Sequence, residues 1–107
     1  MTKKMKTNYD EWREKKFQDP KFRKLYAIEA MKFSIAEKIR NRREFLKMTQ
    51  QELAKRAKTS QSAIARIENT DYDGYSVTKL EEIAEALNAS LIIDFIPKKS
   101  KKGYAYA

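Results

Sequence analysis

The sequence contains neither cysteine nor histidine, and only two glycines and two prolines occur among its 107 residues. The lack of cysteine excludes disulfide bonds, and the lack of both residue types removes the usual ligands of zinc. The most common general base and the most reactive nucleophile of enzymes are missing as well. No apolar run approaches the roughly 20 residues that cross a bilayer, and no apolar segment follows the basic start Met1–Lys6. We therefore expect a cytoplasmic protein that has no catalytic site, no metal and no other cofactor, and that does not enter a membrane.

The chain is strongly basic, but its charge is unevenly distributed. Lysine and arginine number 24 against 15 aspartates and glutamates, which gives a net charge of +9. Residues 1–47 carry 15 basic and 7 acidic side chains, residues 48–90 carry 5 and 7, and residues 91–107 carry 4 and 1. A basic balance alone is weak support for nucleic-acid binding, because many basic helices are simply solvated. Any case for nucleic-acid binding therefore depends on a specific motif.

A chain of 107 residues has room for one domain, and turn and helix-start signals divide it into segments. A short helix is expected from Asn8 to Phe17. Asp19 followed by Pro20 is a favoured helix start, and helical spacing of apolar residues continues to residue 47. One long helix and two helices with a bend near residues 33 and 34 are both compatible with this pattern. The sequence predicts an N-terminal helical extension over residues 1–33, a domain over residues 34–97 and a basic flexible tail over residues 98–107.

Residues 49–68 have the pattern of two short helices joined by a tight turn. Thr49 is a favoured N-cap residue, and Glu52 three positions later completes a capping box. Lys58 and Thr59 make the turn, and Ser60 caps the second helix. This helix directs alanine and isoleucine side chains inward. The opposite stripe holds short or hydrogen-bonding side chains, namely Gln61, Ser62, Ala65 and Arg66.

Side chains of this kind suit contacts with base edges in a major groove, whereas long charged side chains are the ordinary choice for a solvated helix face. Glutamine pairs with adenine and arginine with guanine through two hydrogen bonds, so Gln61 and Arg66 are strong candidates for reading bases, with Ser62 beside them. A plain polar helix face is the competing interpretation. We expect a helix-turn-helix that binds double-stranded operator DNA.

The remaining segment predicts one further helix and one strand. Ser76 is a helix cap, Asn88 is a suitable left-handed stop, and the apolar residues between them have helical spacing. Ser90 to Ile96 then reads as a strand, the only strand candidate in the chain. Because a lone strand cannot satisfy its backbone groups within its own chain, we expect it to pair with a second copy in a homodimer or with the sheet edge of a partner. One face of this strand consists of Leu91, Ile93 and Phe95.

Residues 35–96 resemble the Xre-like family that includes Cro and the phage repressors. The resemblance rests on Thr49-Gln50, Glu52-Leu53-Ala54, Ser60-Gln61-Ser62, Ile64 and Ile67-Glu68, with Leu80, Ile83, Ala84 and Leu87 in the following helix. It implies an all-α fold with a five-helix helix-turn-helix domain, preceded by the N-terminal extension and followed by one short C-terminal β-strand. Lys58 departs from the family, in which glycine is common at that turn position. A left-handed backbone at Lys58 would carry strain of about 1 kcal/mol.

The resemblance also implies roles outside the recognition stripe. Gln50 is similar to the family's phosphate-anchoring glutamine at the start of a helix. Phosphate contacts are expected from four residues of the motif, which are Thr49, Gln50, Lys58 and Ser60. The family places a structural salt bridge between the positions of Arg43 and Glu68. The nearby Arg40 and Arg42 are as compatible with solvated charges as with phosphate contacts.

Three segments are similar to HigA-like antitoxins, namely Asp19–Tyr26 preceded by Phe17, Ser62–Glu68, and Leu87–Ile93. In that family the antitoxin neutralises a HigB- or RelE-type ribonuclease toxin and represses its own operon. Docking candidates for such a toxin are the aromatic residues ahead of the domain, which are Trp12, Phe17, Phe22 and Tyr26.

Two other functions remain open at this point. One is a stand-alone phage or mobile-element repressor without a toxin, and the other is a protein-interaction module that has kept the fold but lost DNA binding. Residues 1–33 carry 10 basic and 5 acidic side chains, which makes this arm a poor electrostatic match for a basic toxin. A toxin contact would then depend on the aromatic side chains or on the acidic stretch between residues 68 and 85.

Overall fold

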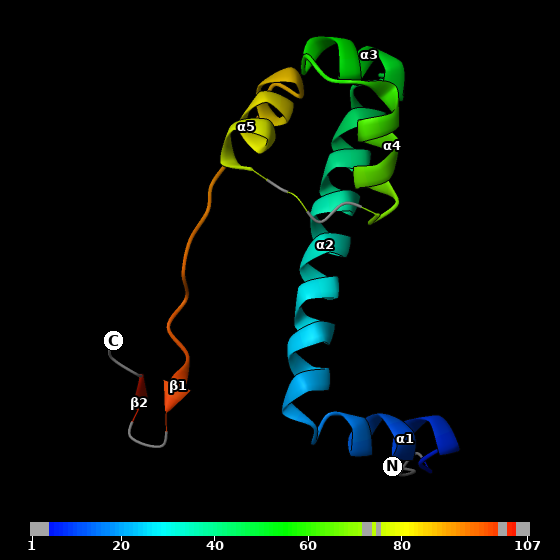
Figure 1. Ribbon diagram of the computed structural model, residues 1–107, viewed down its shortest axis with the longest axis vertical. Coiled ribbons are helices and arrows are strands. Elements are labelled where there is room, and N and C mark those ends of the chain that lie inside the picture. The colour runs from blue at the N-terminus through cyan, green and yellow to red at the C-terminus, as the bar shows by residue number, and fades with distance from the viewer. Residues whose placement is uncertain (1–4, 72–73, 75, 101–102, 105–107) are drawn as a thin grey trace.

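The structure is a computed structural model that describes residues 5–71, 74, 76–100 and 103–104 (Figure 1). The elements in these residues are α1 (Asn8–Lys16), α2 (Pro20–Phe45), α3 (Gln50–Arg56), α4 (Gln61–Glu68), α5 (Val77–Ala86), β1 (Lys99–Ser100) and β2 (Gly103–Tyr104). The two short strands pair antiparallel, with Lys99 opposite Tyr104. None of the helices in this part of the chain is long and apolar enough to cross a membrane.

The hydrophobic core lies between the C-terminal part of α2 and helices α3, α4 and α5. Leu53, Ile64 and Ile83 at its centre are almost completely buried. The other buried members of the core are Ile39, Met48, Ala54, Ala57, Ile67 and Leu87. The all-α class expected from the sequence is confirmed. Five helices occur in the described residues, but α1 contributes no buried residue, so the core itself is built by four of them.

Side-chain caps begin the helices where the sequence predicts them. Thr49 Oγ1 accepts a hydrogen bond from the backbone N–H of Glu52, and the Glu52 carboxylate accepts one from the backbone N–H of Thr49. This is the predicted capping box, and it satisfies two first-turn N–H groups. Caps also begin α2, α4 and α5 at the predicted residues Asp19, Ser60 and Ser76. The helix α1 begins with a further capping box, formed by Thr7 and Asp10.

Helices α2 to α5 all end with a left-handed residue that is not glycine. These four residues have φ angles between 52° and 60°, and they are Lys47, Lys58, Thr70 and Asn88. After α3, Lys58 N donates to Lys55 O and Thr59 N donates to Ala54 O, which are the two hydrogen bonds of a Schellman motif. Lys58 thus adopts the strained backbone expected at this turn. Asn88 has the left-handed conformation expected of the stop after α5.

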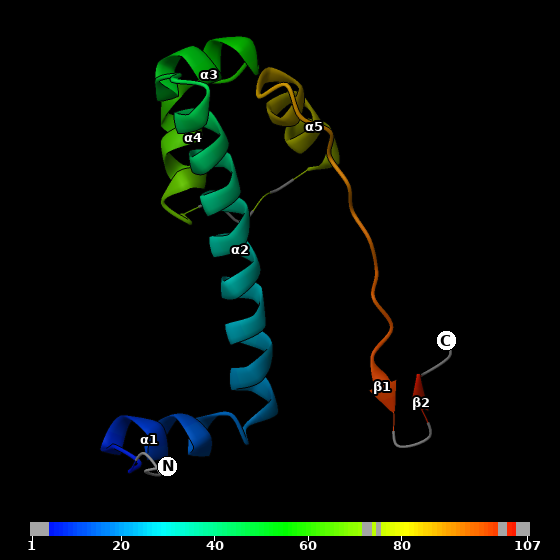
Figure 2. The same ribbon diagram turned by 180° about the vertical axis from the view of Figure 1, so that it is seen from behind.

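The helix α2 is continuous from Pro20 to Phe45, so one long helix replaces the alternative of two. At 1.5 Å per residue its 26 residues span about 39 Å. Only Ala36 and Ile39 of this helix are buried. The N-terminal half therefore projects beyond the core and meets α1 at its far end, as Figure 1 and Figure 2 show from opposite sides. Because the helix runs through residues 33 and 34 without interruption, the domain limit expected there is not a break in secondary structure.

The segment after α5 does not form the predicted strand within this chain. Residues 89–98 have no regular secondary structure, and Ile92, Phe95 and Ile96 are 86%, 92% and 85% exposed. The physical reason is that the described residues place no strand edge beside this segment, so its backbone groups remain open to solvent. The expected strand face of Leu91, Ile93 and Phe95 lies in this irregular segment. The two observed strands form farther on, where a flexible tail was expected, and strand pairing with a second copy stays a prediction.

Candidate nucleic-acid interface

The predicted recognition stripe lies on the outer side of α4. Gln61, Ser62 and Arg66 are exposed, and Ala65 between them is half-buried. The opposite side of the helix is held in the core by two buried isoleucines. A major groove admits an α-helix, and short polar side chains with one arginine can hydrogen-bond to base edges there. The helix α4 thus presents side chains of the type that hydrogen-bond to base edges, from a position fixed by the core.

Thr49 and Ser60 precede the two helices of the motif. Each hydroxyl oxygen accepts a hydrogen bond from the backbone of its own helix, at 3.0 Å for Thr49 and 3.1 Å for Ser60. Capping therefore uses the hydroxyl as an acceptor, and its hydrogen can still be donated. A phosphate oxygen accepts such a bond, so both residues have the chemistry expected of phosphate contacts.

Gln50, the third expected phosphate contact, has a partner inside the protein. It is the first residue of α3 and is half-buried, and its Nε2 donates a 3.1 Å hydrogen bond to Glu68 Oε1. An amide nitrogen carries two hydrogens, so this bond uses one of them. The phosphate contact stays a prediction, but the structure adds a second role, which is to hold the Glu68 carboxylate.

Glu68 is the one charged residue within the described part that is buried, with 2% of its surface exposed. Arg43 donates to it twice, from Nε to Oε2 at 2.8 Å and from Nη2 to Oε1 at 3.0 Å. The hydrogen bonds with Glu68 raise the pKa of Arg43 above its ordinary value. Arg43 Nη1 also donates to Met48 O at 2.8 Å. The structure therefore contains the Arg43–Glu68 pair, which joins the end of α4 to α2 and, through Gln50, to the start of α3.

Two more arginines of α2 bind the ends of other helices. Arg40 Nη2 donates a short hydrogen bond to the backbone oxygen of Glu68. Arg42 donates to Leu87 O at 3.0 Å and to Asn88 O at 3.2 Å. Cations are favoured at helix C-termini because the last carbonyls lack partners and the dipole is negative there. Both arginines thus have structural partners, 28 and 45 positions away along the chain, that no local sequence signal indicated.

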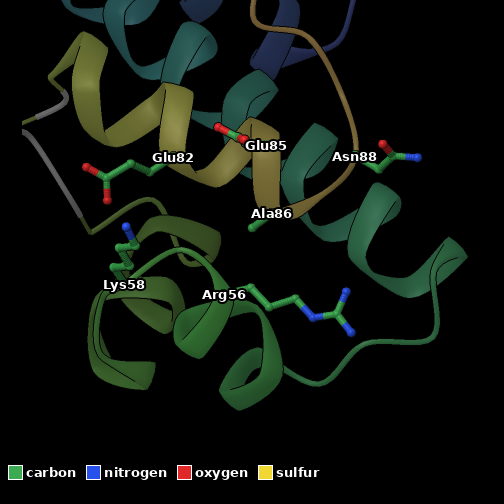
Figure 3. A pocket seen from close by; sticks show the side chains of 6 residues that line it. All are labelled: Arg56, Lys58, Glu82, Glu85, Ala86 and Asn88. Carbon is green, nitrogen blue, oxygen red and sulfur yellow. The ribbon is translucent and has the colours of Figure 1, made fainter.

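Lys58, the fourth expected phosphate contact, lies at an open hollow of about 410 Å³ between the end of α3 and α5 (Figure 3). Arg56 and Lys58 line it from the α3 side, and Glu82 and Glu85 line it from α5. In this view the Lys58 side chain extends toward Glu82. A lining with both signs of charge does not select an anion or a cation, and we assign it no ligand. No group of three or more acidic residues in the described part is placed to hold a metal ion.

The four aromatic residues expected to dock a toxin come together where α1 meets α2. Phe17 packs edge-on against Phe22 and Tyr26, with ring centroids 5.3 and 4.8 Å apart, and Trp12 packs against Phe22 at 6.1 Å. Trp12 and Tyr26 remain 49% and 47% exposed. We call these four residues the aromatic cluster. Figure 1 shows α1 at the opposite end of α2 from α3, so a partner bound to this cluster would lie away from the helix-turn-helix.

Residues 39–93, just over half of the chain, match the helix-turn-helix family. The matched segment begins within the C-terminal part of α2 and extends beyond α5, so it contains the core and the recognition stripe. It does not include α1 or the aromatic cluster. No curated protein and no solved structure matches the chain. The family match therefore bears on the recognition helix and not on the N-terminal arm.

Proposed function

Because this chain belongs to the Xre and Cro family of helix-turn-helix proteins, which are DNA-binding transcription regulators, we propose that it is the antitoxin of a type II toxin–antitoxin pair. In this role it binds a palindromic operator as a dimer, represses its own operon and neutralises a HigB- or RelE-type ribonuclease toxin. DNA binding rests above all on one observation, the exposed stripe of Gln61, Ser62 and Arg66 on a helix whose other side is buried.

The network around Glu68 supports base reading because it fixes α4 relative to the rest of the motif. Binding groups must be held within about 0.5 Å of their productive positions, and buried hydrogen bonds behind them provide this restraint. Glu68 ends α4, and it is bound by Arg43 from α2 and by Gln50 from α3. The recognition stripe and the expected phosphate contacts at the start of α3 therefore move as one unit.

A single short recognition helix contacts few bases, so adequate affinity requires a dimer. A two-fold axis places two recognition helices about 34 Å apart, which matches successive major grooves on one side of the duplex. The exposed apolar segment that follows α5 is the natural candidate for the contact between the two chains.

Replacing the proposed guanine reader tests DNA recognition. We expect Arg66→Ala to weaken specific binding by roughly 1–3 kcal/mol and to relax the preference at one base position. Binding-site selection followed by titration of the selected duplex at fixed salt measures both effects. Arg23→Ala, which removes an equal charge from an exposed position in the N-terminal half of α2, is the matched control. If Arg66→Ala selects the same consensus as the unaltered chain, Arg66 does not read a base.

The N-terminal arm supports the antitoxin assignment because it adds an aromatic surface to a core that is complete without it. The helix α1 contains no buried residue, yet Trp12 and Tyr26 are held in a packed cluster with about half of their surface exposed. Aromatic side chains are enriched in protein interfaces. The radius of gyration is 18.3 Å, against about 13 Å for a compact chain of this length, and Figure 1 shows that both the arm and the segment after α5 extend beyond the core.

Co-expression with the product of the adjacent reading frame tests the toxin. We expect the two proteins to purify as a complex, and we expect Trp12→Ala to weaken it by about tenfold or more, as loss of a central aromatic contact does. Phe45→Ala, which removes an aromatic ring that is 74% exposed at the other end of α2, should leave the complex intact. If no neighbouring product binds while operator binding persists, the chain is a stand-alone repressor, an outcome that the basic charge of the arm favours.

A further inference from the structure

The chain exposes more surface than a compact protein of its size. Its accessible surface is 9537 Å², whereas a compact monomer of 12.6 kDa exposes about 6,200 Å². The excess is about 3,300 Å² for one chain, which is more than the roughly 1,000–2,500 Å² that each chain of a stable homodimer buries. Two exposed surfaces contribute to this excess, a mainly apolar one after α5 and one along α2 that combines aromatic and charged side chains.

The first surface is the segment Leu91–Pro97, which we call the tail segment. Its side chains are mainly large and apolar, with Asp94 as the one charged residue, and most of them are exposed. In extended form it spans about 20 Å. Lys98 follows it directly and begins a basic run in the sequence. The tail segment is therefore an apolar strip with a positive end.

The second surface, which we call the α2 groove, consists of two adjoining hollows of about 390 and 250 Å³. They lie along α2 where it passes the end of α4, and they share Phe33 and Thr70. Phe33 lies where the two hollows meet, Glu29 lines the first hollow, and Glu37 and Arg40 line the second, so the groove has an aromatic centre between charged side chains. From Tyr26 to Arg40 the groove follows α2 for about 21 Å.

We infer that the tail segment of one chain occupies the α2 groove of a second copy, so that two chains exchange tails in a symmetric dimer. The lengths agree, at about 20 Å for the tail segment and about 21 Å for the groove. Apolar side chains would meet Phe33, and Lys98 would approach a groove carboxylate. In Figure 1 and Figure 2 α4 and the segment after α5 lie on opposite sides of α2, so α2 separates the end of α4, which lines the groove, from the tail of the same chain.

Pairing of two tail segments with each other, as a two-stranded sheet, satisfies the backbone but not the side chains. Such a sheet has two faces, and with no layer packed on either of them, both apolar rows remain in water. The groove instead covers one row with Phe33 and the walls of α2. This inference specifies the dimer contact on which the proposed operator binding depends, but it needs neither DNA nor a toxin to be tested.

Sedimentation equilibrium of the full chain, without DNA, tests the exchange. We expect a dimer, and we expect Phe33→Lys to weaken self-association by about tenfold to a hundredfold, because it places a charge where apolar side chains of the tail segment meet Phe33. Met31→Lys is the matched control, since Met31 is 58% exposed on α2 and Phe33 is 60% exposed, but only Phe33 lines the groove. Met31→Lys should remain dimeric, and thermal unfolding should show the same stability for both variants.

Two further variants separate the alternatives. Truncation after Ser90 should give a monomer, and Glu37→Lys combined with Lys98→Glu should associate more strongly than Glu37→Lys alone. A dimer that survives Phe33→Lys but is lost on truncation would show that the tails pair with each other, which overturns the exchange. A full chain that is monomeric, or a truncated chain that stays dimeric, overturns it as well. Operator and toxin binding are measured separately, so their failure would not be confused with these outcomes.

Discussion

The two halves of α2 belong to one continuous helix, yet they are stabilised in different ways. In the C-terminal half, Ala36 and Ile39 are buried, and three arginines bind groups on other helices. In the N-terminal half no residue is buried, and aromatic rings of this half pack against Trp12 of α1 and Phe17 at its end. An isolated helix shorter than about 12–15 residues, such as either half of α2, is marginal in water. Most helix stability in proteins therefore comes from tertiary packing. One half of α2 is therefore part of a domain, and the other half is an arm.

The largest expected effect concerns the buried ion pair that holds the domain half. Glu68→Ala should destabilise the fold by about 3–5 kcal/mol, because it leaves the Arg43 guanidinium largely buried without its partner. Arg43→Ala should destabilise as well, and the double variant should lose less than the sum of the two. Urea unfolding of all four proteins measures the coupling. Glu44→Ala removes a 4.0 Å contact to the same arginine from an exposed side chain and should change little. Additive losses for the first two variants would show that Arg43 and Glu68 do not stabilise each other.

A pair of substitutions within α2 compares its two halves directly. Ile39→Ala should cost about 2–4 kcal/mol, since Ile39 is buried in the core. Leu25→Ala should change the stability by less than about 0.5 kcal/mol, since Leu25 is 63% exposed in the arm. Both variants introduce alanine, which has the highest helix propensity, so the difference between their losses of stability reports on packing. Similar losses from the two variants would mean that the arm is packed as firmly as the domain.

A smaller effect is expected where the packed domain tolerates backbone strain. Thr70 is β-branched and has a φ of 60°, a conformation that glycine adopts without strain. Thr70→Gly should therefore stabilise the domain by about 1 kcal/mol. Gln51→Gly, which places glycine inside α3, should destabilise it by about 0.5–1 kcal/mol. Midpoints of urea unfolding with unchanged slopes measure both shifts, and a loss of stability in Thr70→Gly would contradict the account of strain.

The smallest effect concerns the exposed end of the arm. The backbone N–H of Thr7 donates a hydrogen bond to the Asp10 carboxylate, and the Thr7 hydroxyl donates a second one. The backbone bond first, and the hydroxyl bond after it, hold the pKa of this carboxyl below its ordinary value of 3.8. The charged form is thus favoured in the folded helix, so its contribution is present above pH 3.8 and is lost as the pH falls through the lowered pKa. Fluorescence of Trp12, the single tryptophan, reports fraying of α1 in acid. Asp10→Asn should remove this acid-dependent step, and an identical acid profile in both proteins would exclude the capping carboxylate as its cause.

Local chemistry made the helix starts and stops predictable. Thr49, Ser60 and Ser76 cap helices where their hydroxyls reach N–H groups three residues away, and Asn88 stops α5 through its own backbone preference. The recognition stripe on α4 was likewise visible, because residues three and four apart share a helix face. The continuity of α2 was not decided locally, since the apolar spacing allowed a bend that the structure does not have.

The amino-acid sequence by itself determined which segments are helical, where the helix-turn-helix lies and which residues share the outer face of its second helix, because these depend on neighbours within a few positions. Only the tertiary structure decided that Arg40 and Arg42 bind the ends of α4 and α5, because their partners are distant along the chain. It also decided that the segment after α5 stays irregular, since a strand forms only beside another edge. Hydrogen bonds between distant residues arise when packing brings the helices together, and no local sequence pattern indicates them.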